Sequence, residues 1–69
     1  MKFELEIEQE DDGRWLAEVP ALPGVLAYGA SANETMAKAE VLALRVLAEQ
    51  LEQGEAVPTD ISIWLPAVA

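Results

Sequence analysis

A run of residues 32–53 with neither Gly nor Pro constrains this chain more than any other feature. The run takes up almost a third of the sequence and is rich in Ala, Leu and Glu, which are strong helix formers. Ser31 and Glu34 fit a capping box, in which the serine side chain accepts from the backbone three residues on and the glutamate reaches back. Gly54, with Pro58 beyond it, is the expected stop. We therefore expect one long helix.

The apolar face of this helix is wider than one sheet requires. At 100° per residue the apolar side chains sweep an arc of roughly 220°, about twice what one side of a sheet covers. Those side chains are Met36, Ala37, Ala39, Val41, Ala43, Leu44, Val46, Leu47, Ala48 and Leu51. We assign the stripe of Met36, Leu47 and Leu51 to the core. The excess predicts that a helix of a second subunit covers the other flank.

The small size of the chain also favours self-association. Its 69 residues form one domain, 1–69, and a chain of about 60 residues buries only about 60% of its unfolded surface. The chain has no cysteine and so no disulfide to stabilise so small a core, which leaves oligomerisation as the common source of added stability. We expect a homo-dimer or tetramer, with an interface formed by Val41, Leu44, Ala48 and Trp64.

Four strands are predicted around the helix. Residues 1–8 alternate between apolar and charged side chains, which is the period of a half-buried strand. Turn signals at Asp12-Gly13 and Pro23-Gly24 bound two further strands, residues 15–19 and 25–28, and so predict an antiparallel meander. Residues 60–65 form the last strand, placed by the helical crossover parallel to the first. The predicted fold is α+β with the order β-β-β-α-β, one sheet of order 3-2-1-4 and the helix on one face.

Composition excludes several classes of function. Thirteen acidic residues against four basic ones give a net charge of −9, which is unsuited to direct binding of DNA or RNA. The chain has no His and no Cys, and therefore no Ser-His triad, thiol nucleophile or ordinary zinc site. We predict no catalytic residues, no cofactor and no metal. No signal peptide or membrane-spanning stretch is visible, so we expect a cytoplasmic protein.

The turn and cap residues, taken together and in order, resemble the HicB family of antitoxin domains. Four segments carry the likeness: Asp12-Gly13-Arg14-Trp15, Pro20-Ala21-Leu22-Pro23-Gly24, Gly29-Ala30-Ser31-Ala32-Asn33-Glu34 and Gly54-Glu55-Ala56-Val57-Pro58. The resemblance covers nearly the whole chain, and the Pro-x-Leu-Pro-Gly segment is its most specific part.

This resemblance implies a partial ribonuclease H-like fold and a role as an antitoxin. The implied partner is a HicA-type toxin, a small basic ribonuclease that an acidic chain would cover and block. A net charge of −9 would steer such a partner toward the chain. From the loop resemblance and the charge, the expected partner-binding residues are Glu10, Asp11, Asp12, Trp15, Leu22, Pro23 and Gly24.

Two other functions stay open. One is a stand-alone oligomeric interaction module without a toxin partner. The other is a metal-dependent nuclease, which would need carboxylates converging on a pair of ions. Acids along residues 4–8 lie about 6.8 Å apart on one strand face. Their simplest role is to keep that face solvated, and contact with a basic partner is the alternative.

Overall fold

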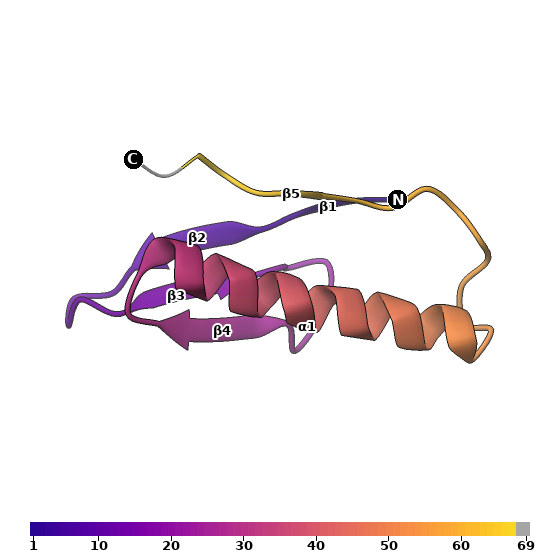
Figure 1. Cartoon of the computed structure of the whole chain (residues 1–69), viewed down its shortest axis with the longest axis horizontal. Coiled ribbons are helices and arrows are strands. Elements are labelled where there is room, and N and C mark those ends of the chain that lie inside the picture. The colour runs from indigo at the N-terminus through magenta and orange to yellow at the C-terminus, as the bar shows by residue number, and fades with distance from the viewer. Residues whose placement is uncertain (68–69) are drawn as a thin grey trace.

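The computed structural model describes residues 1–67 as an α+β fold with one helix and two sheets (Figure 1). Its strands are β1 (Lys2–Glu4), β2 (Glu6–Gln9), β3 (Trp15–Glu18), β4 (Leu26–Gly29) and β5 (Ser62–Trp64). The helix α1 (Ala32–Glu52) lies between β4 and β5 in the chain. Strands β2, β3 and β4 form the predicted antiparallel meander, and α1 packs against it.

Helix α1 begins and ends within one residue of the predicted bounds. The Ser31 hydroxyl oxygen accepts from the Glu34 N–H at 3.2 Å, as a capping box requires. The Glu34 carboxylate, however, accepts from the N–H of Ala30, one residue before the cap, at 3.1 Å. At the other end the Glu55 N–H donates to the Gln50 carbonyl at 2.9 Å, which is the long bond of a Schellman motif.

Both predicted turns are present, and each places a glycine at positive φ. The Gly13 N–H donates to the Glu10 carbonyl at 2.9 Å, and Gly13 has a φ of 90°, as in a three-residue hairpin loop. The Val25 N–H donates to the Leu22 carbonyl at 3.0 Å around Pro23 and Gly24, and Gly24 has a φ of 85°. This second turn is of type II, the type predicted from Pro-Gly.

The first predicted strand is divided at Leu5, and the prediction of one continuous sheet is wrong. Strand β1 pairs in parallel with β5, which confirms the predicted direction of the last strand, whereas β2 pairs with β3. The Leu5 N–H donates to the Trp64 carbonyl at 2.9 Å, so the chain changes its pairing partner at this residue. Pro20 follows soon after β3 and Pro66 soon after β5, and a proline cannot donate to a ladder. Each ladder therefore stops near Leu5.

The core lies between α1 and the inner faces of the strands. Ile7, Ala17 and Ala27 stand side by side across the meander, and this row faces the helix. The buried core residues are Phe3, Leu5, Ala17, Val19, Leu22, Val25, Met36, Ala39, Ala43 and Leu47. The core assignment of Met36 and Leu47 is confirmed.

The molecule is elongated, measuring 41 × 19 × 16 Å. Figure 1 shows why: the C-terminal half of α1 extends past the end of the meander. Leu51 lies in this overhanging part and is 40% exposed, so its assignment to the core was wrong. No helix within residues 1–67 is both long and apolar enough to cross a membrane.

Candidate partner-binding surfaces

The meander has one face that no helix within residues 1–67 covers. Strand side chains alternate between faces, so the neighbours of the buried Ile7–Ala17–Ala27 row point away from α1. We name this surface the open sheet face. It consists of two cross-strand rows, Glu6–Glu18–Leu26 and Glu8–Leu16–Tyr28.

The open sheet face is acidic on one side and apolar on the other. Glu6, Glu8 and Glu18 gather on β2 and the adjoining end of β3, whereas Leu26 and Tyr28 on β4 are 46% and 44% exposed. Glu6 lies directly opposite Glu18, an arrangement of like charges that destabilises a sheet. The salt bridges within residues 1–67 join Lys2 to Glu4, Arg14 to Asp12 and Lys38 to Glu34, so none of them neutralises this trio.

The hairpin tip, residues 10–14, adjoins the Tyr28 end of this face. The Arg14 side chain donates through Nε to Asp12 at 2.8 Å, and its guanidinium lies 4.9 Å from the centre of the Tyr28 ring. The Arg14 backbone N–H and then its side chain lower the pKa of Asp12 below its usual 3.8. Arg14 is therefore held in place by an acid and an aromatic ring, while Glu10 and Asp11 lack an ion pair in the described part of the chain.

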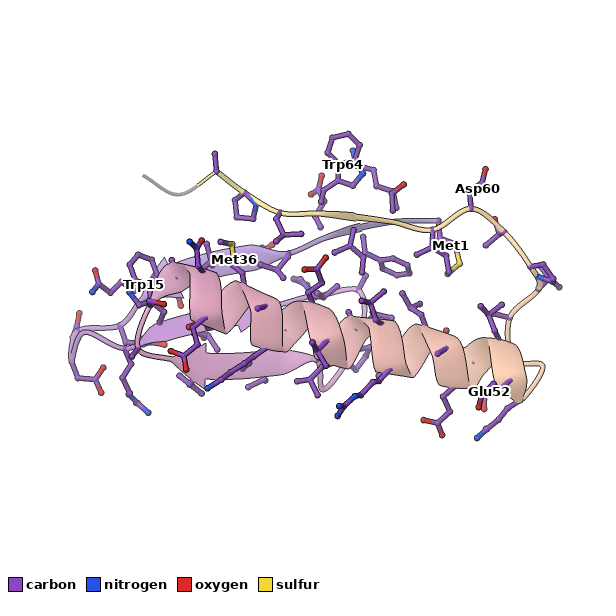
Figure 2. All side chains as sticks on the ribbon, in the orientation of Figure 1. Met1, Trp15, Met36, Glu52, Asp60 and Trp64 are labelled. Carbon is purple, nitrogen blue, oxygen red and sulfur yellow. The ribbon has the colours of Figure 1, made fainter. Side chains whose placement is uncertain are left out.

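The seven predicted partner-binding residues do not form one site. Glu10, Asp11 and Asp12 precede β3, whereas Leu22, Pro23 and Gly24 follow it, so the two groups lie at opposite ends of that strand. Leu22 is only 6% exposed and belongs to the core, which leaves it little surface for a partner. Trp15 shares its strand face with the buried Ala17 and is half-buried on the helix side (Figure 2).

The predicted oligomer-interface residues lie on two separate surfaces. Val41 and Leu44 are 45% and 51% exposed, and Ala48 is exposed on the same helix. Trp64 is 57% exposed on β5 and points away from α1 (Figure 2). The Lys2 ammonium lies 4.5 Å from the centre of the Trp64 ring. The same Lys2 nitrogen lies 3.7 Å from a carboxylate oxygen of Glu4.

The open sheet face holds three residues that sequence reasoning missed, which are Glu18, Leu26 and Tyr28. Contact of Glu6 and Glu8 with a basic partner was expected as the alternative to a solvated strand face, but their place beside these three residues was not. The signal was the alternation of Leu26, Ala27 and Tyr28, in which the small residue marks the buried side.

The side chains of this surface offer carboxylate and apolar contacts to a partner. Within residues 1–67 no three acidic side chains come close enough together to hold a metal ion. An exposed face with carboxylates on one side and apolar side chains on the other can take a partner with cationic and apolar groups. No family model, curated protein or solved structure matches this chain.

Proposed function

We propose that this chain is an antitoxin-like protein that binds and inhibits a small basic toxin of the HicA type. The observation that carries the proposal is the open sheet face, an uncovered surface whose three carboxylates form no salt bridge within residues 1–67. The ordered resemblance of the turn and cap residues to the HicB family supports the choice of partner. The partial ribonuclease H-like fold implied by that resemblance is part of the same proposal.

Electrostatics explains why the partner is basic. The Glu6–Glu18 pair is repulsive in the free chain, and a lysine or arginine of a partner placed between the carboxylates removes that repulsion. The net charge of −9 also accelerates the encounter with a basic protein at low salt. Binding is therefore expected to weaken as the salt concentration rises.

The apolar half of the open sheet face supplies the rest of the interface. Leu26 and Tyr28 are nearly half exposed, and their burial against a partner is favourable because it removes apolar area from water. Tyrosine is also a residue type enriched where proteins bind each other. Inhibition then follows from occlusion, because the chain covers the basic surface with which the toxin holds RNA.

The test uses a HicA-type toxin encoded beside this chain, purified and assayed for RNA cleavage. We expect the wild-type chain to stop cleavage and to bind more tightly at low salt, as measured by calorimetry. The double variant Glu6→Gln/Glu18→Gln should bind at least about tenfold more weakly, which corresponds to about 1.4 kcal/mol. The control Glu49→Gln/Glu55→Gln removes the same charge from the end of α1 and the following turn, and should bind normally.

Two results would count against the proposal. One is RNA cleavage that continues at a saturating concentration of the chain. The other is equal weakening by both double variants, which would mean that net charge alone acts and that the open sheet face is not the contact.

A stand-alone oligomeric module is the second candidate, and the exposed apolar side of α1 favours it. In that case the chain self-associates but inhibits no toxin, so the RNA-cleavage assay separates the two functions.

A further inference from the structure

Strand β2 has an outer edge that β5 does not cover. The Leu5 N–H donates to a carbonyl of β5 at 2.9 Å, so odd-numbered residues of the first strand turn their backbone groups toward β5. The Glu10 N–H donates to the Arg14 carbonyl at 2.7 Å, so even-numbered residues turn theirs toward β3. The N–H and C=O groups of Ile7 and Gln9 therefore point outward, past the end of β5. We name this row the free edge of β2.

The sequence prevents β5 from covering this edge. Continued parallel pairing would place the nitrogen of Pro66 opposite the Leu5 carbonyl, and proline has no N–H to donate. After Trp64 the chain moves away from β2 (Figure 1). Within residues 1–67 no hydrogen bond reaches the backbone groups of Ile7 or Gln9 on this edge. An extended segment of another chain can therefore add to the sheet there.

The other outer edge of the meander, on β4, is partly occupied by groups of the chain itself. The Val25 carbonyl accepts at 3.0 Å from the residue that follows β3, so Leu26 and Tyr28 turn their backbone groups outward. The Leu26 N–H donates to the Gly24 carbonyl at 3.2 Å. The Tyr28 carbonyl accepts from the Lys38 ammonium at 3.3 Å, and a lysine is a common guard of a sheet edge. The free edge of β2 is therefore the more accessible of the two.

Charge decides which strand can pair with the free edge of β2. Glu6 and Glu8 flank its outward-facing groups, and their side chains belong to the open sheet face. A second copy that paired through the same edge would set these carboxylates beside those of its own β2, and like charges opposite each other destabilise a sheet. A strand with Lys or Arg on that face forms attractive cross-strand pairs instead. The edge therefore disfavours a second copy and favours a cationic strand.

The opposite face of an added strand lies beside apolar groups. Ile7 is half-buried on the helix side and packs against the core. An apolar side chain placed next to Ile7 would remove further apolar area from water. At the end where β5 leaves the edge, a hollow of about 260 Å³ has Glu6, Trp64 and Leu65 in its lining. This hollow offers room, a carboxylate and apolar surface to the first cationic side chain of the added strand.

We propose that a basic partner protein adds an extended segment to the free edge of β2, with Lys or Arg alternating with apolar residues. The choice of a basic protein rests on the proposed function, whereas the mode of attachment rests on the edge itself. The added strand lengthens the three-stranded sheet and brings its cationic side chains beside the carboxylates of the open sheet face. Main-chain hydrogen bonds supply affinity, and the alternation of side chains supplies specificity.

The probe for this edge is a short synthetic peptide of alternating Lys and Val, blocked at both ends and added to the full chain. Amide hydrogen exchange, followed by NMR, shows where the peptide binds. We expect exchange of the Ile7 and Gln9 N–H groups to slow by at least about tenfold. The Tyr28 N–H on the edge of β4 is the internal control and should exchange as before. A peptide of alternating Glu and Val should not bind.

N-methylation of the peptide separates strand addition from simple charge attraction. In an antiparallel pairing the Val N–H groups face β2, whereas in a parallel pairing the Lys N–H groups face it. Methylation of the amides that face β2 removes the donors of the ladder, and methylation of the others leaves the ladder intact. One of the two methylated peptides should therefore lose binding while the other keeps it, and the result also gives the direction of the added strand.

The contribution of the carboxylates is tested on the chain itself. Glu6→Gln/Glu8→Gln should weaken peptide binding by at least about threefold, because it removes the partners of two cross-strand ion pairs. Glu49→Gln/Glu55→Gln is the matched control, since it removes the same charge from the end of α1 and the following turn. This control should bind the peptide nearly as well as the wild type does.

Three results would each overturn the proposal. The first is unchanged exchange of Ile7 and Gln9 at the highest peptide concentration, and the second is equal loss of binding by the two methylated peptides. The third is equal weakening by the two double variants. The RNA-cleavage assay measures toxin inhibition separately, so the chain could inhibit the toxin while this mode of attachment fails. A chain that takes the peptide at this edge but inhibits no toxin fails only the proposed function.

Discussion

Glu18 lies opposite Glu6 in the register of β2 and β3 and diagonal to Glu8 on the same face. Replacing Glu18 by Gln removes one charge from this trio and changes neither the size nor the shape of the side chain appreciably. We expect the free chain to become more stable while its affinity for a basic toxin falls. Such opposite changes are the mark of a surface kept for binding at some cost in stability.

The gain in stability follows from the sheet geometry. Directly opposed carboxylates are separated by about 6 Å and diagonal ones by about 7.5 Å. In water these distances correspond to repulsions of about 0.7 and about 0.55 kcal/mol. Screening at physiological salt, where the Debye length is about 8 Å, lowers their sum to about 0.5 kcal/mol. For a domain of this size that sum raises Tm by about 2–4 °C.

The assay is thermal unfolding of Glu18→Gln and of Glu55→Gln at two salt concentrations. Both variants have the same net charge, but Glu55 lies after α1, away from the trio. At about 20 mM salt, Glu18→Gln should raise the free energy of unfolding by about 0.9 kcal/mol, because the repulsion of Glu18 by Glu6 and Glu8 is less screened. An equal gain for Glu55→Gln, or no gain at either salt concentration, would refute the reasoning, since the repulsion would then not be local to the open sheet face.

Three further substitutions test the fold. Gly29→Ala places a Cβ against the Thr35 hydroxyl and should lower the free energy of unfolding in urea by about 1–3 kcal/mol. The loss should be smaller when the same substitution is made in a Thr35→Ala background. Leu47→Ala should cost about 2–5 kcal/mol in the same assay, because Leu47 is 4% exposed in the core. The Ala30 N–H, and then Lys38, lower the pKa of Glu34 below its usual 4.5. Ionised Glu34 therefore stabilises the fold above pH 4.5. The Tm difference between wild type and Glu34→Gln should shrink as the pH falls below 4.5 and vanish below the lowered pKa of Glu34 in the folded chain.

Each of these predictions has a clear opposite result. If Gly29→Ala lowers the free energy of unfolding equally with and without Thr35→Ala, the added Cβ does not clash with the Thr35 hydroxyl. A Leu47→Ala cost under about 1 kcal/mol would mean that the site is not close-packed. A Tm difference for Glu34→Gln that persists at low pH would mean that ionisation of Glu34 does not stabilise the cap.

Much of the fold could be predicted from the sequence because its signals are local. Capping by Ser31 and the stop at Gly54 involve residues within one turn of the helix ends. The turns at Gly13 and Gly24 depend on the conformations that single residues can adopt. Alternation along residues 1–8 correctly predicted the buried positions of Phe3 and Leu5. What it did not reveal was the change of pairing partner at Leu5, because pairing depends on residues far away in the chain.

The candidate surfaces show the same division more sharply. The acidic composition and the wide apolar arc of the helix were visible in the sequence, because both can be counted from the residues alone. Which acids stand together was not visible, because Glu6 and Glu18 meet only through the register of β2 against β3. Leu22 was misplaced for a similar reason, since an apolar residue in a turn can point inward or outward.

By itself the sequence determined the elements of this protein: one long capped helix, tight turns at glycines, a half-buried first strand and a strongly negative charge. These follow from the conformational preferences and charges of neighbouring residues, which do not depend on the rest of the chain. Only the tertiary structure decided that the meander turns one face away from α1 and that three carboxylates and three large apolar side chains share it. That outcome depends on strand register and helix placement, because a shift by one residue would move every side chain to the other face.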